Sequence, residues 1–276
     1  MPTSRIALAQ WLPEPGAAAS NLAQALEFID AAAARGADLV VLPELWDSGC
    51  GPALADDVRA AAEPLDGPRG EALAGRARAH GLWLCAGSVC EPHAGGVANA
   101  AVLYDRSGAV VAVHRKAHLY APGGEDRALV PGDRMTVVET GEFGAVGLAI
   151  CFDGDFPEAA RALRDAGARV VLHPSAYELE AETWWDRLYP ARALENGQWW
   201  LSCNQCGATG GFTMLGASRV VAPDGSITGE AVRARAGETP DAALLVVDVD
   251  FAVGLGEWDA HCGVLLAGRR PGVYDA

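Results

Sequence analysis

Short apolar runs alternate along this chain with stretches of helical spacing, and the pattern predicts an α/β protein. Leu22, Leu26 and Ile29 recur on one stripe behind Ser20, which predicts an amphipathic helix with a serine cap. The apolar run at Asp38–Leu42 instead predicts a buried strand. The expected helices are Asn21–Arg35, Arg69–His80, Phe156–Ala166 and Thr183–Glu195. The expected strands are Arg5–Trp11, Asp38–Leu42, Leu82–Val89, Ala98–Tyr104, Ala109–Arg115, Ala145–Ile150, Arg169–Leu172, Trp199–Asn204, Ala217–Ala222 and Leu244–Val249.

The order of these elements predicts a mixed sheet with helices on its outer faces, because helices are separated by pairs of strands. A turn at Arg106–Gly108 is expected to join two of the strands in a hairpin. The 276 residues fit one large α/β domain, and they contain no internal repeat, low-complexity tract or linker. We therefore expect a single domain over residues 1–276, with Tyr120–Asp133 as its longest loop.

Three polar residues stand where expected strands end, and together they have the chemistry needed to attack an amide. Glu44, Lys116 and Cys151 each follow an apolar run, at the strand end where open α/β sheets place their reactive groups. Cys151 would be the nucleophile, Glu44 the base, and Lys116 the cation that faces the developing oxyanion. Taken singly, they could be a small core cysteine, a helix-start carboxylate and a surface lysine. Their occurrence together favours the catalytic interpretation.

The proton on the thiol decides how such a site would work. A neutral thiol is a poor nucleophile, so Cys151 must be a thiolate or lose its proton to a base as it attacks. Apolar neighbours are expected to raise the pKa of Glu44 toward the value that suits a general base at neutral pH. The same carboxyl would then protonate the leaving ammonia and activate water. The backbone N–H of Phe152, next to the nucleophile, is expected to be a second oxyanion donor.

Six segments, in order, make the chain resemble the nitrilase superfamily of carbon–nitrogen hydrolases across nearly its whole length. They are Leu42–Leu45, Arg115–Leu119, Cys151–Glu158, Arg192–Asn196, Asn204–Gly207 and Gly216–Gly225. Members of this superfamily cleave nitriles, amides and ureido groups with a Glu–Lys–Cys triad, so the resemblance implies that Glu44, Lys116 and Cys151 form it. The resemblance also implies a four-layer α-β-β-α sandwich and a homodimer or larger homo-oligomer.

Four further residues are candidates around the triad, and the resemblance accounts for two of them. It implies that Glu125 is a second glutamate that positions the lysine and the base, although a solvated loop charge is the alternative. It places Tyr177 in a pocket wall, and Trp46, close to Glu44 in the chain, is expected to line the pocket. Asp155 is expected to cap the helix that follows it. Alternatively, Asp155 contacts the substrate, where a carboxylate would suit a molecule that carries an amine.

The expected substrate is a small linear primary amide, hydrolysed to a carboxylate and ammonia through a Cys151 thioester. The resemblance favours amides over nitriles, because Phe152 and Asp153 follow the nucleophile where the nitrile branch commonly has Trp-Glu. Two enzymatic alternatives are hydrolysis of an N-carbamoyl amine or amino acid, and acyl transfer to an acceptor other than water. A noncatalytic binding protein on the same fold is a further alternative, but it would not need all three triad residues.

Composition narrows the partners and the compartment. The formal net charge of −15 argues against nucleic acid, because binding to phosphate backbones needs clustered lysine and arginine. Seven cysteines without disulfide-scaffold spacing favour a reducing compartment, so we expect a cytoplasmic protein. We expect no signal peptide and no membrane partner, because no apolar stretch reaches the ~20 residues that span a bilayer.

No cofactor or metal is expected. Cys203 and Cys206 have C-x-x-C spacing, but they follow a strand and no second pair of zinc ligands is suitably spaced. His114 and His118 lie four residues apart in a segment that is expected to be a strand end, so their spacing does not predict a metal site. The chain also lacks a glycine-rich phosphate loop.

Overall fold

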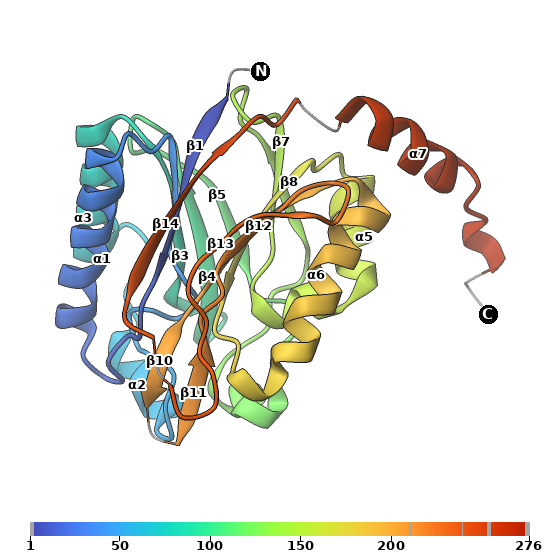
Figure 1. Ribbon diagram of the computed structural model, residues 1–276. Coiled ribbons are helices and arrows are strands. Elements are labelled where there is room, and N and C mark those ends of the chain that lie inside the picture. The colour runs from blue at the N-terminus through green and yellow to red at the C-terminus, as the bar shows by residue number, and fades with distance from the viewer. Residues whose placement is uncertain (1–2, 210, 239, 253–254, 274–276) are drawn as a thin grey trace.

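Two sheets lie face to face in the computed structural model, which describes residues 3–209, 211–238, 240–252 and 255–273 (Figure 1). The first sheet contains β1 (Ser4–Gln10), β2 (Leu39–Val41), β3 (Trp83–His93), β4 (Gly96–Tyr104), β5 (Val110–Arg115) and β14 (Ala243–Val249). The second contains β6 (Thr136–Glu139), β7 (Ala145–Leu148), β8 (Val170–Ser175), β9 (Trp199–Asn204), β12 (Arg219–Val221) and β13 (Ile227–Glu230). Their strand orders are β14-β1-β2-β3-β4-β5 and β13-β12-β9-β8-β7-β6.

The alternation of side chains along each strand produces the layers. Ile6 and Leu8 of β1 share one core with Leu148 and Leu172 of the opposite sheet. The intervening Ala7 belongs to a different core, on the outer face of the first sheet. Successive residues of a strand point to opposite faces, so a fully apolar strand such as β1 can be buried on both sides.

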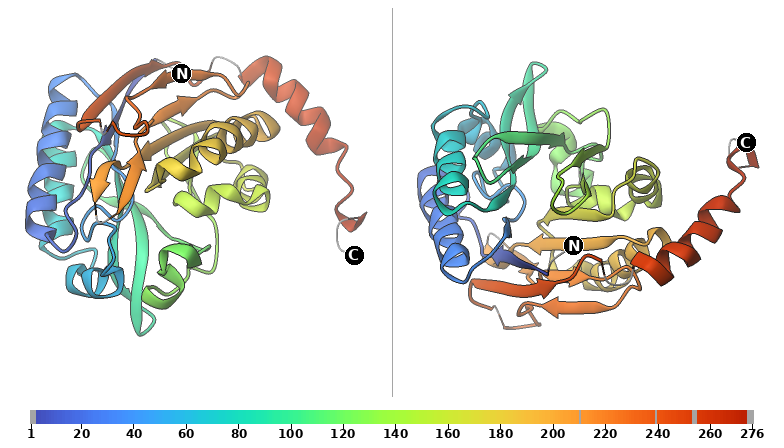
Figure 2. Two further views of the ribbon diagram at one scale, coloured as in Figure 1. Left: turned by 60° about the horizontal axis from the view of Figure 1, so that its bottom comes forward. Right: turned by 90° about the horizontal axis from the view of Figure 1, so that it is seen from above.

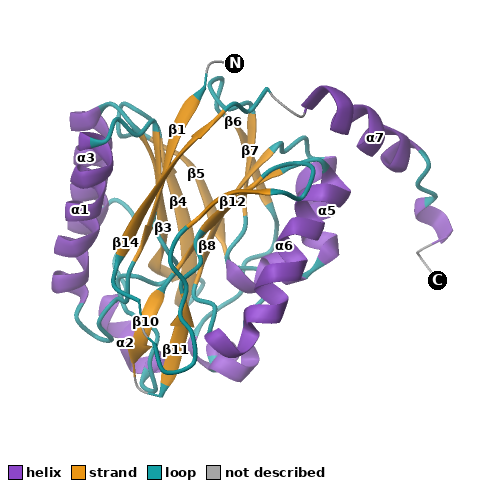
Figure 3. Ribbon diagram, viewed as in Figure 1, coloured by secondary structure: helices purple, strands orange, loops and turns teal. Residues whose placement is uncertain are grey.

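Helices cover both outer faces (Figure 3). On the first sheet, α1 (Ala18–Ala34) and α3 (Pro68–His80) lie side by side, and Ile29 shares a core with Leu84 of β3. On the second sheet, α5 (Pro157–Asp165) and α6 (Glu182–Asn196) cover the outer face, and Leu163 shares a core with Val171 of β8. The order helix, sheet, sheet, helix confirms the α-β-β-α sandwich expected from the sequence.

Strand direction brings the predicted site residues to the same edge. Strand β2 is parallel to β3, which pairs antiparallel with β4, and β4 pairs antiparallel with β5. Strands β2 and β5 therefore run the same way, and the residues that follow them, Glu44 and Lys116, leave the first sheet at one edge. Strand β7, which precedes Cys151, lies in the facing sheet. The site is therefore formed between the sheets, at the carboxyl ends of three strands.

Several elements lie outside the sequence prediction. The missed strands are β6 and β13 and the hairpin of β10 (Cys206–Thr209) and β11 (Phe212–Leu215), and the missed helices are α2 (Leu54–Ala61), α4 (Glu125–Ala128) and α7 (Leu255–Ala267). The expected β4–β5 hairpin is confirmed. The segment Tyr120–Asp133 is not a plain loop, because α4 lies within it.

Figure 2 shows α7 extending from the side of the sandwich that carries α5 and α6. Among the helices of the described residues, none has the length and hydrophobicity required to cross a membrane.

Candidate active site

Cys151 stands at a strained turn, shortly after strand β7 ends at Leu148. It begins a short 3₁₀ turn, Cys151–Asp155, and its φ of 44° lies in the left-handed region that non-glycine residues seldom adopt. Its carbonyl oxygen lies 3.0 Å from Nε2 of His173. Burial lowers the pKa of His173 to about 4, so the ring is neutral near pH 7 and donates to this carbonyl. Cys151 is therefore held in place through its own backbone.

Glu44 is fixed at a second strained turn. The next residue, Leu45, has a φ of 43°, and its N–H donates to Oγ of Ser88 at 3.0 Å. Nε2 of Gln205 donates to the carbonyl of Glu44 at 2.7 Å. The Glu44 side chain is almost fully buried, and its carboxyl lies within hydrogen-bonding reach of the Cys151 thiol. The backbone around Glu44 thus holds the carboxyl against the sulfur.

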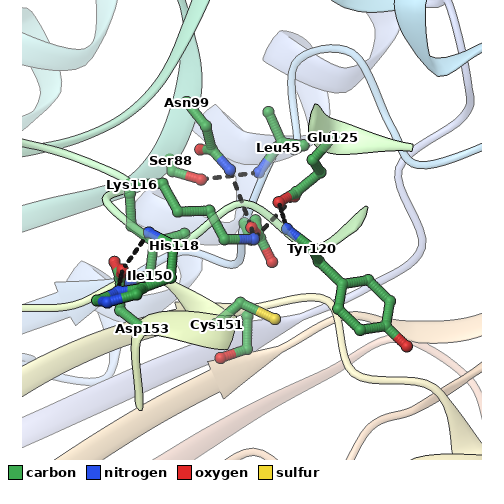
Figure 4. Close-up of polar contacts among 12 residues, drawn as sticks. Leu45, Ser88, Asn99, Lys116, His118, Tyr120, Glu125, Ile150, Cys151 and Asp153 are labelled. Carbon is green, nitrogen blue, oxygen red and sulfur yellow. Dashed lines mark hydrogen bonds and ion pairs between the residues drawn. The ribbon is translucent and has the colours of Figure 1, made fainter. Parts of the chain in front are cut away.

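Lys116 pairs with two glutamates, and Figure 4 labels one of them, Glu125. Nζ of Lys116 lies 2.8 Å from Oε1 of Glu44 and 2.7 Å from Oε1 of Glu125. The second oxygen of Glu125 accepts the backbone N–H of Tyr120 at 2.7 Å. Glu125 is itself buried, so the alternative interpretation as a solvated loop charge is wrong. The structure brings all four predicted catalytic residues, Glu44, Lys116, Glu125 and Cys151, into one cluster.

The electrostatics of this cluster determine the resting proton positions. Burial raises the pKa of the Glu44 carboxyl, and the Lys116 ammonium only partly offsets this effect. Burial alone would lower the pKa of Lys116, but the carboxylates of Glu44 and Glu125 raise it well above its ordinary value. Burial and then the charge of Glu44 raise the pKa of the Cys151 thiol. Cys151 is therefore a neutral thiol at rest, and it would have to lose its proton to a base as it attacks.

Asp153 connects the turn at Cys151 to the segment that carries Lys116. Its two oxygens accept the N–H of Ile150 at 3.0 Å and the N–H of His118 at 2.9 Å, and they also contact both imidazole rings. Burial alone would raise the pKa of Asp153, but the hydrogen bonds from His114 and His118 outweigh it and lower that pKa well below its usual value. The Asp153 carboxylate therefore links the segments that follow β5 and β7, one from each sheet, and holds them together at the site.

A cavity of about 610 Å³ opens beside the cluster. Glu44, Lys116, Glu125 and Cys151 all lie on its wall. Three of the four residues predicted to surround the substrate also line it, and these are Phe152, Tyr177 and Asp155. The volume suits a small molecule, because ligand pockets commonly enclose about 300–1,000 Å³.

Two expectations from the sequence are wrong. Trp46 does not line the cavity: it is fully buried in the core under α1 and α3, and its Nε1 donates to the carbonyl of Ala86 at 2.6 Å. Asp155 does not cap α5, because Phe156 is the N-cap residue and makes no side-chain cap hydrogen bond. Instead, the Asp155 carboxylate accepts hydrogen bonds from the hydroxyls of Tyr177 and Tyr189. These contacts hold it on the cavity wall.

Asn99 is the site residue that sequence reasoning missed. Its Nδ2 donates to Oε1 of Glu44 at 2.9 Å, and the side chain is completely buried. Its Oδ1 has no hydrogen-bond partner in the described part of the chain. An amide inside the apolar run Val97–Tyr104 is the available signal, because a buried polar side chain in a strand needs a partner. The strand pattern alone does not identify that partner as Glu44.

The described residues contain no group of three or more His, Cys, Asp or Glu side chains arranged to hold a metal ion. Cys203 and Cys206 are both buried free cysteines. Their Sγ atoms lie close to the carbonyls of Ala9 and Asp241, respectively. Both cysteines are therefore engaged with backbone rather than with each other.

Comparisons with known proteins agree with this geometry. The profile of the family described as carbon-nitrogen hydrolase matches residues 5–255. A hydrolase of Pseudomonas protegens is 36% identical over 273 residues, which cover 99% of this chain and 91% of that protein. An omega-amidase of Xenopus tropicalis is 30% identical over 236 residues, which cover 82% of this chain and 84% of that protein.

Solved structures show the same similarity. A cysteine-to-alanine mutant of an amidase from Nesterenkonia sp. AN1, in complex with butyramide, superposes with a TM-score of 0.80 at 32% identity. The match covers 98% of this chain and 95% of that one. A glutamate-to-leucine mutant of that amidase carries the acetamide moiety of fluoroacetamide on its active-site cysteine. It superposes with a TM-score of 0.77 at 33% identity over 95% of this chain and 97% of that one.

Proposed function

Because the chain belongs to the carbon–nitrogen hydrolase family, whose members act on carbon–nitrogen bonds other than peptide bonds, we propose that it hydrolyses small linear primary amides with Cys151 as the nucleophile. The observation that carries the proposal is the Lys116 ammonium, held between two buried glutamates beside the cysteine on the wall of the cavity. The omega-amidase and the butyramide-bound amidase among the similar proteins support an amide as substrate.

The reaction follows from the position of each group. Sγ of Cys151 attacks the carbonyl carbon while its proton passes to the Glu44 carboxylate. The oxyanion that forms is stabilised by the Lys116 ammonium and by the backbone N–H of Phe152. When the carbon–nitrogen bond breaks, Glu44 returns the proton to nitrogen, and ammonia leaves a thioester behind. Water then attacks the thioester with Glu44 again as base, and the acid product leaves as the thiol regains its proton.

The two carboxylate oxygens of Glu44 have different roles in the reaction. Oε1 accepts hydrogen bonds from both Lys116 and Asn99, so its lone pairs are occupied. Oε2 is then the oxygen that takes the proton from Cys151. In this proposal Asn99 is a positioning residue: it fixes the rotation of the carboxylate and stabilises its charged form.

A screen for released ammonia tests the proposal. The protein should release ammonia from aliphatic amides such as pentanamide, with one carboxylate formed for each ammonia. An N-carbamoyl amine hydrolase would release carbon dioxide together with ammonia from ureido compounds, and hydroxylamine in place of water would reveal acyl transfer. Release of no ammonia from any amide or ureido compound would favour a binding protein on the same fold.

Replacing Asn99 by leucine should lower kcat/KM about 10- to 100-fold and move the acidic limb of its pH profile to higher pH. The reason is that a hydrogen bond to the charged carboxylate lowers the pKa of Glu44, so its loss adds to the rise that burial already causes. Full pH profiles of kcat/KM for pentanamide would measure both effects.

Asn196→Leu is a matched control. Asn196 is equally buried, but its Nδ2 donates to the carbonyl of Arg192 instead of to Glu44. This variant should lose stability without any movement of the acidic limb. If Asn99→Leu also left the limb in place, Asn99 would be only a packing residue.

We further propose a single domain, a cytoplasmic location and a homodimer or larger homo-oligomer. The free cysteines support a reducing compartment, and the family resemblance supports the assembly. Light scattering of the purified chain would test the assembly directly.

A further inference from the structure

The outer part of the cavity wall is acidic. Besides the inner cluster, the cavity is lined by the carboxylates of Asp155, Glu178 and Glu180. The one cationic side chain on the described lining is Lys116, and its ammonium already lies against two glutamates. A substrate tail that extends from Cys151 toward the opening therefore meets a wall with more carboxylates than cations.

The arginines around the cavity make their ion pairs with other carboxylates. Arg192 donates to the backbone oxygens of Gly154 and Asp155 and pairs with Glu195, and its charge also lowers the pKa of Asp155. Arg233 pairs with the carboxylates of Glu182, Asp186 and Glu230. Arg127 pairs with Asp126. Within the described residues, no ion pair reaches the cavity carboxylates of Asp155, Glu178 or Glu180.

The contacts of Asp155 leave one of its oxygens able to accept a hydrogen bond from a ligand. Both phenol hydroxyls, from Tyr177 and Tyr189, donate to the same oxygen, Oδ1. The other oxygen, Oδ2, accepts no hydrogen bond from the residues that the structure describes. Burial raises the pKa of Asp155, and the hydrogen bonds of the two phenols oppose that rise because they favour the ionised carboxylate.

Aromatic side chains complete the wall. Tyr120, Trp184 and Phe212 all line the cavity, and each is more than a third exposed, Trp184 the most at 61%. Phe152 and Phe156 also line the cavity and are less exposed. Aromatic faces combined with carboxylates form the usual environment for an organic ammonium ion, because the ring quadrupole attracts the cation while the rings cover its alkyl chain.

We propose that the preferred substrate is an amide with a primary ammonium at the end of its chain, bound by Asp155, Glu178 and Glu180, and that ω-carboxylate amides are rejected. This inference rests on the proposed amide hydrolysis and adds the class of tail. The negative charge of the whole chain acts in the same direction, because it attracts cations to the opening and repels anions.

Three amides of similar size test the charge of the tail. Pentanamide ends in a methyl group, 4-aminobutanamide has an ammonium in the same place, and succinamate has a carboxylate. We expect kcat/KM for 4-aminobutanamide to exceed that for pentanamide roughly tenfold, and succinamate to fall roughly tenfold below pentanamide. High salt should bring the kcat/KM values of the three amides closer together, because dissolved ions screen the charge of the exposed Glu180.

The double variant Glu178→Gln/Glu180→Gln should reduce the ratio of 4-aminobutanamide to pentanamide by about fivefold to tenfold. Glu27→Gln/Glu71→Gln is the matched control, because it removes two exposed carboxylates from α1 and α3, on the other side of the sandwich (Figure 1). The control should keep the wild-type ratio. An equal loss of preference in both variants would mean that net charge, and not the cavity wall, selects the tail.

Binding separates this inference from the proposed reaction. Calorimetry with Cys151→Ala and the same three amides measures the charge preference without turnover. Hydrolysis of all three amides at similar rates, with equal binding to this variant, would overturn the tail preference and leave the amidase proposal intact. Preferred binding of 4-aminobutanamide by a wild-type protein that releases no ammonia would support the tail preference and overturn the proposed reaction.

Discussion

Replacement of Cys151 by alanine should lower kcat for amide hydrolysis about 10⁵-fold or more, because no other group in the cluster can form the acyl intermediate. The fold should survive, since the substitution removes one sulfur atom from the edge of a cavity and leaves the Asp153 hydrogen bonds that fix the turn. Ammonia release at saturating pentanamide, with denaturant unfolding in parallel, would measure both quantities.

Cys85→Ala is the control for loss of a thiol. Cys85 is buried in the core between the sheets and does not line the cavity. This variant should lose roughly 1–2 kcal/mol of unfolding free energy and retain its turnover. Turnover in Cys151→Ala within tenfold of the wild type would show that a different residue or a bound water attacks the substrate.

Replacement of Lys116 by methionine should lower kcat/KM about 10⁴-fold and reduce stability by roughly 3–5 kcal/mol. Without the ammonium, the buried carboxylates of Glu44 and Glu125 face each other unpaired, so one of them must take up a proton. The pKa of Glu44, already raised by burial, then rises further, and the base is protonated at neutral pH. The oxyanion also loses its cation. Steady-state kinetics and urea unfolding would measure the two losses.

A second change separates the structural from the chemical part of this effect. Lys116→Met/Glu125→Gln removes the carboxylate that would otherwise stay unpaired, so it should recover part of the lost stability. Activity should not return, because the cation that faces the oxyanion is still missing. Recovery of activity together with stability would mean that Lys116 has only a structural role.

The triad could be predicted because each member follows an apolar strand. Glu44, Lys116 and Cys151 stand at strand ends in the sequence, and the direction of β2, β5 and β7 brings those ends together. The apolar runs predicted a mixed sheet with helices on its outer faces, because a strand that is buried on both faces is apolar throughout. The four-layer sandwich was implied only by the family resemblance. Short elements such as β10 and β11 were missed, because a few residues carry too little periodicity to identify a strand.

The remaining site residues depend on which way a side chain points, and the chain order does not contain that information. Trp46 follows Glu44 by two residues, yet it points into the core under the helices and not into the cavity. Asp155 precedes a helix, which favours a cap, but two tyrosines from distant segments hold its carboxylate on the cavity wall. Asn99 reaches Glu44 across the sheet from β4, a contact that only the folded register creates.

Iodoacetamide labelling followed by peptide mass mapping tests the central claim most directly. Cys151, next to the Glu44 carboxyl at the cavity wall, should gain a single acetamide group, and ammonia release should fall in proportion to this labelling. The Glu44→Gln variant should react more slowly at the same site, because the thiol then lacks its proton acceptor. Preferential labelling of Cys50, or full activity after complete labelling of Cys151, would contradict the account.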